Sequence, residues 1–297
     1  MLLICGTVPL ADSILITGKA AFDGEKLLIA GKEISCTQGT AALVSAACVA
    51  ALHCGILEPQ VALAGDCGNG KGSRLIYNYL IASLAKVSPA VLVLHYILPV
   101  MGLMKKVCDA AGKCPQKPVM IADASSMYAA KAAGLAPLFD IFTPHLCEMA
   151  FLADPEALHP AYVSRHLFGA EIAQAPELIA SAFRHKNAAR TLLLKGATDH
   201  VIQDGKTIST IDKPDIPAME AIGGTGDTIS GMVGAFVAAG FAHTAAAILA
   251  AKANRRAAEI IGAKPATKIR EIIAALPAAI NDLSVQKVST KQGGIYD

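Results

Sequence analysis

Gly223-Gly224-Thr225-Gly226-Asp227-Thr228 is the stretch of this chain that says most about its fold. It opens the apolar segment 229–239, whose length and composition predict a helix. Backbone N–H groups at a glycine-rich helix start are unpaired and unscreened by side chains, so they favour a bound anion such as phosphate. The sequence therefore predicts an anion hole for a nucleotide phosphate, formed by Gly224, Thr225 and Gly226.

Asp227 is the one acid inside this motif. A carboxylate beside an anion hole can take the proton of a hydroxyl while the amides stabilise the phosphoryl group that moves to it. We predict that Asp227 is the catalytic base. In the alternative interpretation, the motif is only a glycine-rich turn before a capped helix, and Asp227 complements the helix dipole.

The composition narrows the class of protein. Of 297 residues, 54% are hydrophobic and 17% charged, so the chain can bury a large core and is not disordered. A net charge of +2 gives no basic patch, and nucleic acid is not expected as a partner. Few aromatic residues and no Trp argue against stacking platforms for bases. Eight cysteines without a C-x-x-C pair indicate reduced thiols and a cytoplasmic location.

Two apolar segments raise the question of a membrane. Residues 1–9 lack a basic region, so we do not expect a signal peptide. Residues 231–251 carry no formal charge and are long enough to span a bilayer. Gly240, His243 and Thr244 interrupt that run, which indicates two buried helices separated by a turn. No membrane partner is expected.

Short apolar runs alternate with amphipathic runs along the chain. Strands free of charge are typical of a parallel sheet buried on both faces between helices. We therefore predict an α/β fold over residues 1–297, a single domain of three α/β/α layers with a mainly parallel central sheet and no separate lid domain. The predicted strands are 26–30, 60–64, 90–95, 118–122, 140–143, 190–194 and 201–203, and the predicted helices are 40–54, 73–86, 100–111, 125–133, 148–153, 176–186, 225–239, 244–261 and 268–283.

Residues 65–73, Gly-Asp-Cys-Gly-Asn-Gly-Lys-Gly-Ser, lie between a predicted strand and a predicted helix. They come within one residue of the P-loop pattern G-x-x-x-x-G-K-[ST]. The hydroxyl that ligates Mg²⁺ in a P-loop should follow Lys71, but Gly72 stands there and Ser73 is displaced by roughly 100° around the helix. We favour a tight strand–helix turn, with a P-loop-type nucleotide-binding protein as the alternative.

Polar side chains follow three other predicted strands, and ligands of open α/β sheets bind at the carboxyl ends of strands. Asp123 ends one strand, and Lys195-Gly196-Ala197 follows another. In Thr143-Pro-His145-Leu-Cys-Glu148, Glu148 is suited to orient Mg²⁺ through water. The alternative for this last segment is a helix start with Thr143 as N-cap and proline at the first helical position.

In this order, the segments resemble the ribokinase-like superfamily, and within it the ATP- or ADP-dependent NAD(P)H-hydrate dehydratases (the YjeF carboxy-terminal family). Thr143-Pro-His-x-x-Glu148, Lys195-Gly-Ala197 and Gly223-Gly-Thr-Gly-Asp227 follow the order of the family. Residues 27–31, 39–43 and 50–55 look like its first strand, glycine turn and helix, so the resemblance covers residues 26–262. It implies ATP or ADP and Mg²⁺ as cofactors, nucleotide binding by Lys195, Gly196 and Ala197, and a substrate side formed by Gly39, Thr40, Asp123 and His145.

Three departures from the family pattern concern the substrate side. The glycine-rich loop after the third strand falls on His95-Tyr-Ile-Leu-Pro99, which has no glycine. The family segment Asp-Ala-Asp-Ala-Leu-Asn corresponds to 121–126, with one carboxylate and the asparagine lost, and Cys147 replaces a glycine. Nucleotide binding is therefore predicted more firmly than the acceptor.

The resemblance implies an enzyme that phosphorylates a hydroxyl of hydrated NAD(P)H and then eliminates phosphate. The alternative is a kinase of a small alcohol, such as a sugar or a vitamin precursor. A nucleotide-binding regulator without turnover is a third class, which the intact Asp227 disfavours. The sequence leaves the oligomeric state open, a homo-oligomer included.

Overall fold

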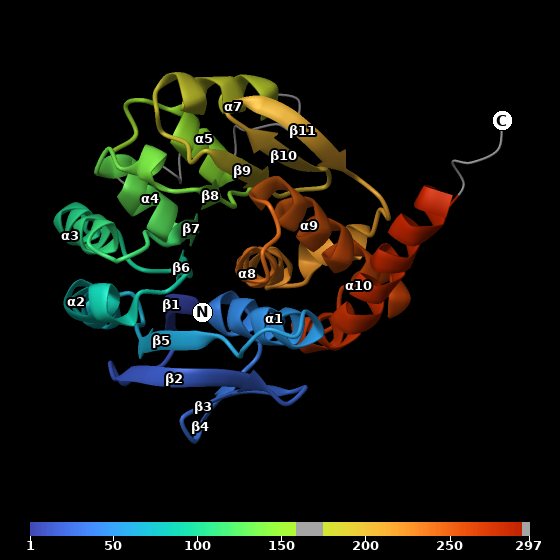
Figure 1. Ribbon diagram of the computed structural model, residues 1–297, viewed down its shortest axis with the longest axis horizontal. Coiled ribbons are helices and arrows are strands. Elements are labelled where there is room, and N and C mark those ends of the chain that lie inside the picture. Colours follow the sequence, from blue (N-terminus) through green and yellow to red (C-terminus); the bar gives the residue numbers. More distant parts are fainter. Residues whose placement is uncertain (159–174, 293–297) are drawn as a thin grey trace.

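The computed structural model describes residues 1–158 and 175–292, with side chains up to residue 283. Its centre is an 11-stranded sheet in the order β11-β10-β9-β8-β7-β6-β1-β5-β2-β3-β4 (Figure 1). Six neighbouring strands in the middle are parallel. They are β9 (Thr191–Leu194), β8 (Ile141–Phe142), β7 (Val119–Asp123), β6 (Val91–His95), β1 (Leu2–Val8) and β5 (Gln60–Gly65).

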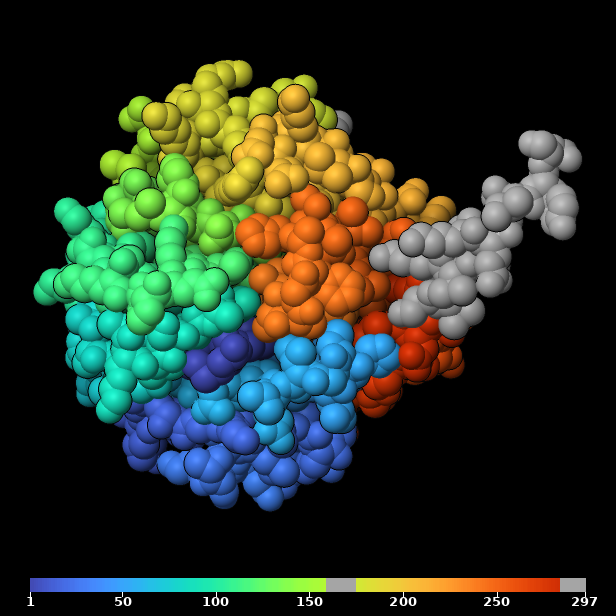
Figure 2. Space-filling model, viewed as in Figure 1, coloured from blue at the N-terminus to red at the C-terminus, as the bar shows by residue number. Residues whose placement is uncertain are grey.

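Antiparallel strands extend both edges of this parallel centre. One edge holds β2 (Leu15–Phe22), β3 (Lys26–Ile29) and β4 (Lys32–Ser35), and the other holds β10 (Asp199–Gln203) and β11 (Lys206–Ile211). In the space-filling view of Figure 2, the blue N-terminal strands and the yellow region of α7 and β9–β11 accordingly form opposite ends of the molecule.

Helices cover both faces of the sheet, because the central strands are apolar on both. Leu2 and Ile4 of β1 join the core under one group of helices, whereas Leu3 and Cys5 join the core under the other. The first group comprises α1 (Gly39–His53), α8 (Thr225–Ala238), α9 (His243–Ile260) and α10 (Ile269–Gln292); the second comprises α2 (Lys71–Val87), α3 (Met101–Gly112), α4 (Ser125–Ala132), α5 (Leu146–Ala153) and α7 (Ala175–Arg184) (Figure 1). The predicted three-layer α/β/α architecture is confirmed.

The edges of the sheet differ from the prediction. Residues 26–30 do not supply the first parallel strand: Lys26–Ile29 forms β3, in an antiparallel hairpin at the sheet edge. The first parallel strand is Leu2–Val8, from the apolar segment that we considered only as a targeting signal. The polar strands β2, β4 and β11 were not predicted, because strands with exposed faces lack the charge-free character on which the prediction rested.

The apolar run 231–251 is divided between α8 and α9, with Gly240 at φ +92° in the turn between them. Among the described residues, no helix is both long and apolar enough to cross a membrane.

Glycines on one face of α8 set its distance from the layers beneath it. A Cβ atom at Gly231 would lie 2.0 Å from the carbonyl oxygen of Leu43 in α1, and one at Gly234 would lie 2.8 Å from a methyl group of Val93 in β6. Only glycine allows this approach. The N-terminus of α8 is thereby fixed beside the carboxyl ends of the parallel strands.

Candidate active site

The start of α8 has the form of an anion hole. Its N-cap, Gly224, has φ +99°, a left-handed conformation that glycine adopts freely, and no described side chain caps the helix. The hydroxyl of Thr225 turns back to the carbonyl oxygens of Met219 and Ile222. The first N–H groups of α8 therefore have no side-chain partner, as a phosphate site requires.

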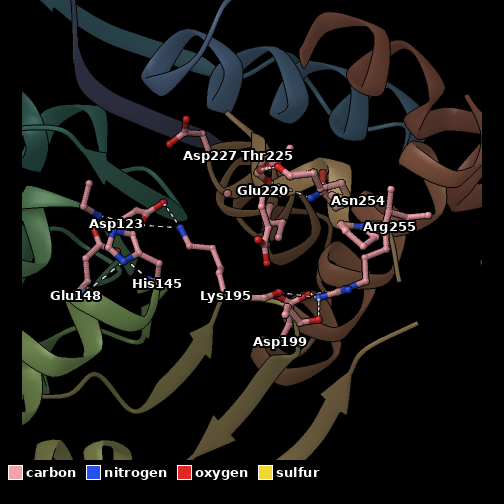
Figure 3. A pocket seen from close by; sticks show the side chains of 18 of the residues that line it. Asp123, His145, Glu148, Lys195, Asp199, Glu220, Thr225, Asp227, Asn254 and Arg255 are labelled. Carbon is pink, nitrogen blue, oxygen red and sulfur yellow. Dashed lines mark hydrogen bonds and ion pairs between the residues drawn. The ribbon is translucent and has the colours of Figure 1, made fainter. Parts of the chain in front are cut away.

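A cavity of about 610 Å³ opens at this helix start (Figure 3). The predicted site residues that line it come from four segments of the chain: Thr225, Gly226 and Asp227 of α8, Lys195, Gly196 and Ala197 after β9, Asp123 at the end of β7, and His145 and Glu148 at the start of α5. Convergence of these strand ends on one edge of the sheet follows from their parallel pairing.

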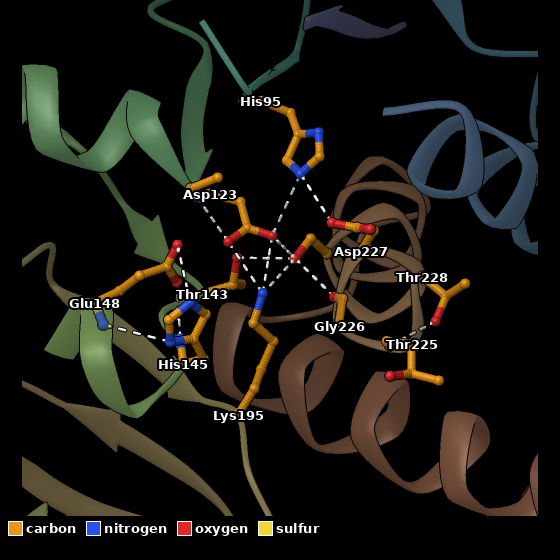
Figure 4. Close-up of polar contacts among 12 residues, drawn as sticks. His95, Asp123, Thr143, His145, Glu148, Lys195, Thr225, Gly226, Asp227 and Thr228 are labelled. Atoms are coloured by element: carbon orange, nitrogen blue, oxygen red, sulfur yellow. Dashed lines mark hydrogen bonds and ion pairs between the residues drawn. The ribbon is translucent and has the colours of Figure 1, made fainter. Parts of the chain in front are cut away.

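Asp227 is held from two sides at the wall of the cavity. Its Oδ2 accepts a hydrogen bond from the backbone N–H of Gly39 at 2.7 Å, and its Oδ1 lies 3.1 Å from Nε2 of His95 (Figure 4). Burial opposes ionisation of Asp227, but the hydrogen bond and charge of His95, together with Lys195 and Gly39, outweigh it, so the pKa of Asp227 is lowered. A carboxylate ionised in this way can accept a proton.

His95 is a residue of the candidate site that the sequence prediction did not include. It is fully buried, and its Nδ1 lies 2.9 Å from the hydroxyl of Thr40. A proton on Nε2 faces Asp227, so the imidazole donates a hydrogen bond to the carboxylate. Thr40, predicted on the substrate side, instead lies behind His95 and is itself buried, and neither Gly39 nor Thr40 is among the residues that line the cavity.

Lys195 and Asp123 form a buried ion pair next to Asp227. The ammonium of Lys195 lies 3.0 and 2.9 Å from the two carboxylate oxygens of Asp123. Burial would lower the pKa of Lys195, but the carboxylates of Asp123 and Glu148 outweigh it and raise the pKa, so the side chain stays charged. Ser230, which we did not predict, completes the network by bonding to Asp123 and to the hydroxyl of Thr143.

The start of α5 differs from the predicted cap. The N-cap is His145, not Thr143: Nδ1 of His145 accepts from the N–H groups of Cys147 and Glu148, while Glu148 Oε2 accepts from the N–H of His145 at 2.9 Å. Pro144 consequently precedes the helix. The reciprocal arrangement is a capping box with histidine in the place of serine or threonine.

Glu148 has an environment that suits a cation. Its side chain is buried, and burial and the negative charge of Asp123 raise its pKa to about 7. Two mutually repelling carboxylates favour a positive ion nearby. Among the described residues, the group with metal-ligand geometry is His95, Asp123 and Asp227, whose ligand atoms lie within 4.8 Å of one another. Glu148 does not belong to that group, so a role for it toward Mg²⁺ stays a prediction.

Arg255 of α9, also missed, fixes the loop after β9. It bonds to Asp199 at 2.8 Å and to the carbonyl oxygens of Gly196 and Ala197 at 2.8 and 2.9 Å. The N–H of Gly196 is donated to Asp199 as well. Asn254 ties α9 to the start of α8 through Thr228 and the carbonyl of Thr225. Both residues lie in a polar stretch of α9, 252–256, so the sequence alone did not distinguish them from the other polar residues of the helix.

The turn at 65–73 contains a carboxylate in place of an external anion. Asp66 accepts hydrogen bonds from the N–H groups of Gly68, Gly70 and Ser73, and from the hydroxyl of Ser73. A Cβ at Gly72 would lie 2.2 Å from the carbonyl oxygen of Gly65, which explains the glycine after Lys71. These amides are already satisfied, so the turn lacks the open cradle of a P-loop.

Comparison with known proteins supports the family resemblance inferred from the sequence. The family model for NAD(P)H-hydrate dehydratase matches residues 101–277. An uncharacterized protein of Methanocaldococcus jannaschii is 37% identical over 197 residues, which are 66% of this chain and 80% of that protein.

Three solved structures have a similar fold at low sequence identity. A member of the UPF0031 family from Bacillus subtilis has a TM-score of 0.55 and 14% identity, with 94% of this chain and 91% of that chain covered. A ribokinase-like superfamily protein from Enterococcus faecalis V583 has a TM-score of 0.53 and 15% identity, covering 94% and 86%. Pyridoxal kinase from Staphylococcus aureus in complex with pyridoxal has a TM-score of 0.51 and 12% identity, covering 87% and 88%. The fold is therefore ribokinase-like.

Proposed function

This chain belongs to the NAD(P)H-hydrate dehydratase family, and from that premise we propose that it uses ATP or ADP to phosphorylate a hydroxyl of hydrated NAD(P)H and then releases phosphate. A nucleotide-dependent enzyme of dehydratase or kinase type is the class that the family supports. The observation that carries the proposal is Asp227: an ionised carboxylate on the cavity wall, held by Gly39 and His95 at the uncapped start of α8.

The residues divide the first step between them. Asp227 takes the proton of the acceptor hydroxyl. At the same time the hydroxyl oxygen bonds to the terminal phosphorus of the nucleotide, and the bond from that phosphorus to the rest of the nucleotide breaks. The N–H groups at the start of α8 stabilise the charge on the phosphoryl oxygens, and the ammonium of Lys195 adds a positive charge from the other side. Mg²⁺, held through water by Glu148, would neutralise the nucleotide phosphates.

The second step removes the phosphate from the ring. The carbon–oxygen bond to the phosphate breaks, the neighbouring ring carbon loses a proton, and a carbon–carbon double bond restores the dihydronicotinamide. A kinase of a small alcohol would stop before this step. The loop at residues 95–99 favours keeping that second candidate, because it departs from the family pattern on the acceptor side.

The wider setting rests on composition. All eight cysteines are free thiols, most of them buried, which supports the predicted cytoplasmic location. The partners that we propose are the nucleotide and the small-molecule acceptor, not nucleic acid, and a homo-oligomer remains compatible with the chain.

The test combines hydrated NADH, Mg²⁺ and either ATP or ADP, and follows the return of nicotinamide absorbance. Asp227→Asn keeps the size of the side chain and one acceptor oxygen but removes the base, so turnover should fall by a factor on the order of 10²–10⁴. Nucleotide affinity should change much less, because the amides that bind phosphate are unchanged.

Glu148→Gln is the matched variant, since it also replaces one carboxylate by an amide in the same cavity. It should raise the Mg²⁺ concentration needed for half-maximal rate rather than abolish proton removal. Near-normal turnover by Asp227→Asn would refute the proposal. Consumption of nucleotide with a stable phosphorylated product, and no return of absorbance, would identify the kinase.

A further inference from the structure

Tyr96 stands in a backbone conformation that tyrosine rarely adopts. It follows β6 directly, with φ +50°, where the related family pattern has glycines. Ala124 follows the neighbouring strand β7 with φ +52°. Both residues line the cavity that contains Asp227. A bulky residue in this conformation is a strained outlier, and such outliers gather at functional sites.

Burial in the core does not account for a tyrosine at this position. Tyr96 is 47% exposed, which places it among the exposed large hydrophobic residues. A glycine would remove the backbone strain, yet the chain has an aromatic ring here that is open toward the cavity. Because the ring is open toward the cavity, we look for a ligand that it could contact there.

The ring is held firmly beside the base. It packs edge-on against the imidazole of His95, with ring centroids 4.3 Å apart and an interplanar angle of 72°. On another side, Cε2 of Tyr96 lies 3.6 Å from the position that a Cβ atom on Gly39 would occupy. His95 and Gly39 are the two residues that bond to Asp227, so the ring is fixed relative to the carboxylate that takes the proton.

The hydroxyl end of Tyr96 lies in the acidic part of the cavity. Burial, followed by the charges of Asp227 and Asp123, raises the pKa of Tyr96, so the phenol stays neutral. Its hydroxyl has no hydrogen-bond partner among the described residues. The side chain thus offers a neutral aromatic surface and one unused polar group next to the reacting carboxylates.

We infer that Tyr96 is the platform on which the ring of the acceptor packs. The acceptor would carry a partly unsaturated nitrogen heterocycle with its hydroxyl on the ring or directly next to it, so that a ring on Tyr96 places the hydroxyl toward Asp227. This inference rests on the proposed function, because it assumes that the acceptor hydroxyl meets Asp227. It gives a reason for the missing glycines at 95–99, and it revises our expectation that the chain offers no stacking surface.

Reduced nicotinamide mononucleotide is a suitable probe, because it carries the dihydropyridine ring, fluoresces, and lacks an adenine that could occupy the nucleotide site. Binding would be measured with a non-hydrolysable ATP analogue and Mg²⁺ present. Tyr96→Phe keeps the ring, and we expect its affinity to stay within about two-fold of the original, given that stacking carries the contact. Tyr96→Leu removes the aromatic face and should weaken binding by about 5- to 100-fold, the range for stacking on an aromatic side chain.

The two variants share the backbone strain of the original, so strain cancels in the comparison. Tyr96→Met replaces Tyr96→Leu if the latter does not melt cooperatively, and affinity for the ATP analogue should be unaffected in all of them. The inference would be overturned if Tyr96→Leu bound the probe as tightly as the unaltered protein, or if Tyr96→Phe lost as much affinity as Tyr96→Leu. Failure of the unaltered protein to bind the probe would also overturn it.

Turnover measurements separate this inference from the proposed function. If hydrated NADH is not converted but the probe binds through Tyr96, the proposed reaction fails and the platform stands. If hydrated NADH is converted and kcat/KM is the same in Tyr96→Leu, the reaction stands and the platform fails.

Discussion

His95 links the carboxylate of Asp227 to the interior of the protein. Its imidazole bonds to Asp227 on one side and to the hydroxyl of Thr40 on the other, and no solvent reaches it. A glycine at position 95 would have no side chain to make either contact. The hydrogen bond from His95 is the largest of the influences that offset the burial of Asp227 and lower its pKa.

Removing that hydrogen bond should change the pH dependence of the reaction. In His95→Leu, the burial of Asp227 is offset only by Lys195 and Gly39, so its pKa rises and the acidic limb of kcat/KM against pH moves to higher pH. The rate below that limb should fall by about 10- to 100-fold, since a hydrogen bond to a charged group contributes about 1.5–3 kcal/mol.

His95→Gln is the matched control for this prediction. Its amide can donate from nearly the position of Nε2, so the acidic limb should stay close to that of the unaltered enzyme. An unchanged profile in His95→Leu would mean that His95 only fills space. A loss of rate without any shift of the limb would assign it a purely structural role.

At the scale of elements, the contact of α8 with α1 decides where the anion hole lies. The contact depends on Gly231, whose replacement would force a methyl group against the carbonyl of Leu43. Because that carbonyl belongs to the backbone of a buried helix, it cannot move aside without shifting α1 and the Gly39 amide at its start.

Gly231→Ala should therefore lower the free energy of unfolding by about 1–3 kcal/mol, the usual cost of overpacking, despite the better helix propensity of alanine. Gly102→Ala in α3 is the matched control, since a Cβ there meets nothing within 4 Å. It should leave stability unchanged or raise it by up to about 1 kcal/mol. Urea unfolding followed by circular dichroism measures both. Equal stability of the two variants would contradict the packing argument.

The strands that could be predicted from sequence are those whose residues are apolar throughout. Residues 60–64 and 118–122 gave β5 and β7 because buried parallel strands are continuously apolar. β11 could not be recognised, because most of its residues are exposed and most are polar. β1 is as apolar as any central strand but stands alone before the polar hairpin strands, so its partners β5 and β6 were not evident.

The candidate site likewise has residues that could be predicted from sequence and residues that could not. Asp123 and Lys195 could be predicted because each ends a strand, and strand ends of a parallel sheet share one edge. The partners that give these groups their properties could not. Ser230 bonds to Asp123 across 107 residues and His95 to Asp227 across 132, and no local pattern encodes such pairs.

At the scale of the whole molecule, two of the described helices, α2 and α8, begin at glycine-rich segments, and of these two only α8 begins with amides that have no side-chain partner. The turn at 65–73 is closed by Asp66, whereas the start of α8 faces the cavity. The cavity is lined by six acids and two bases, Lys195 and Arg255, although the chain as a whole has a net charge of +2. Of these two bases, Arg255 is already bound to Asp199 and to backbone carbonyls.

Two lysine variants test which turn binds the nucleotide. Lys195→Met removes the cation next to the open helix start, and nucleotide affinity measured by calorimetry should fall by about ten-fold or more, as for loss of a charged hydrogen bond. Lys71→Met makes the same chemical change at the closed turn and should leave affinity unchanged. A comparable loss in Lys71→Met would revive the P-loop interpretation. Melting curves show whether the unpaired Asp123 has unfolded the first variant.

The hydrogen bond between Gly39 and Asp227 joins residues 188 positions apart in the chain. At the speed of translation, roughly 5–20 residues per second, the segment with Gly39 precedes Asp227 by about 10–40 s. During this interval the sheet face that α8 will cover, and the side of α1 that packs on it, have no partner from α8. Exposed apolar surface of this kind favours aggregation and is what chaperones protect during synthesis. Asp227 is made together with the helix that covers this face, so under the proposed function a partly synthesised chain lacks its base and cannot consume nucleotide.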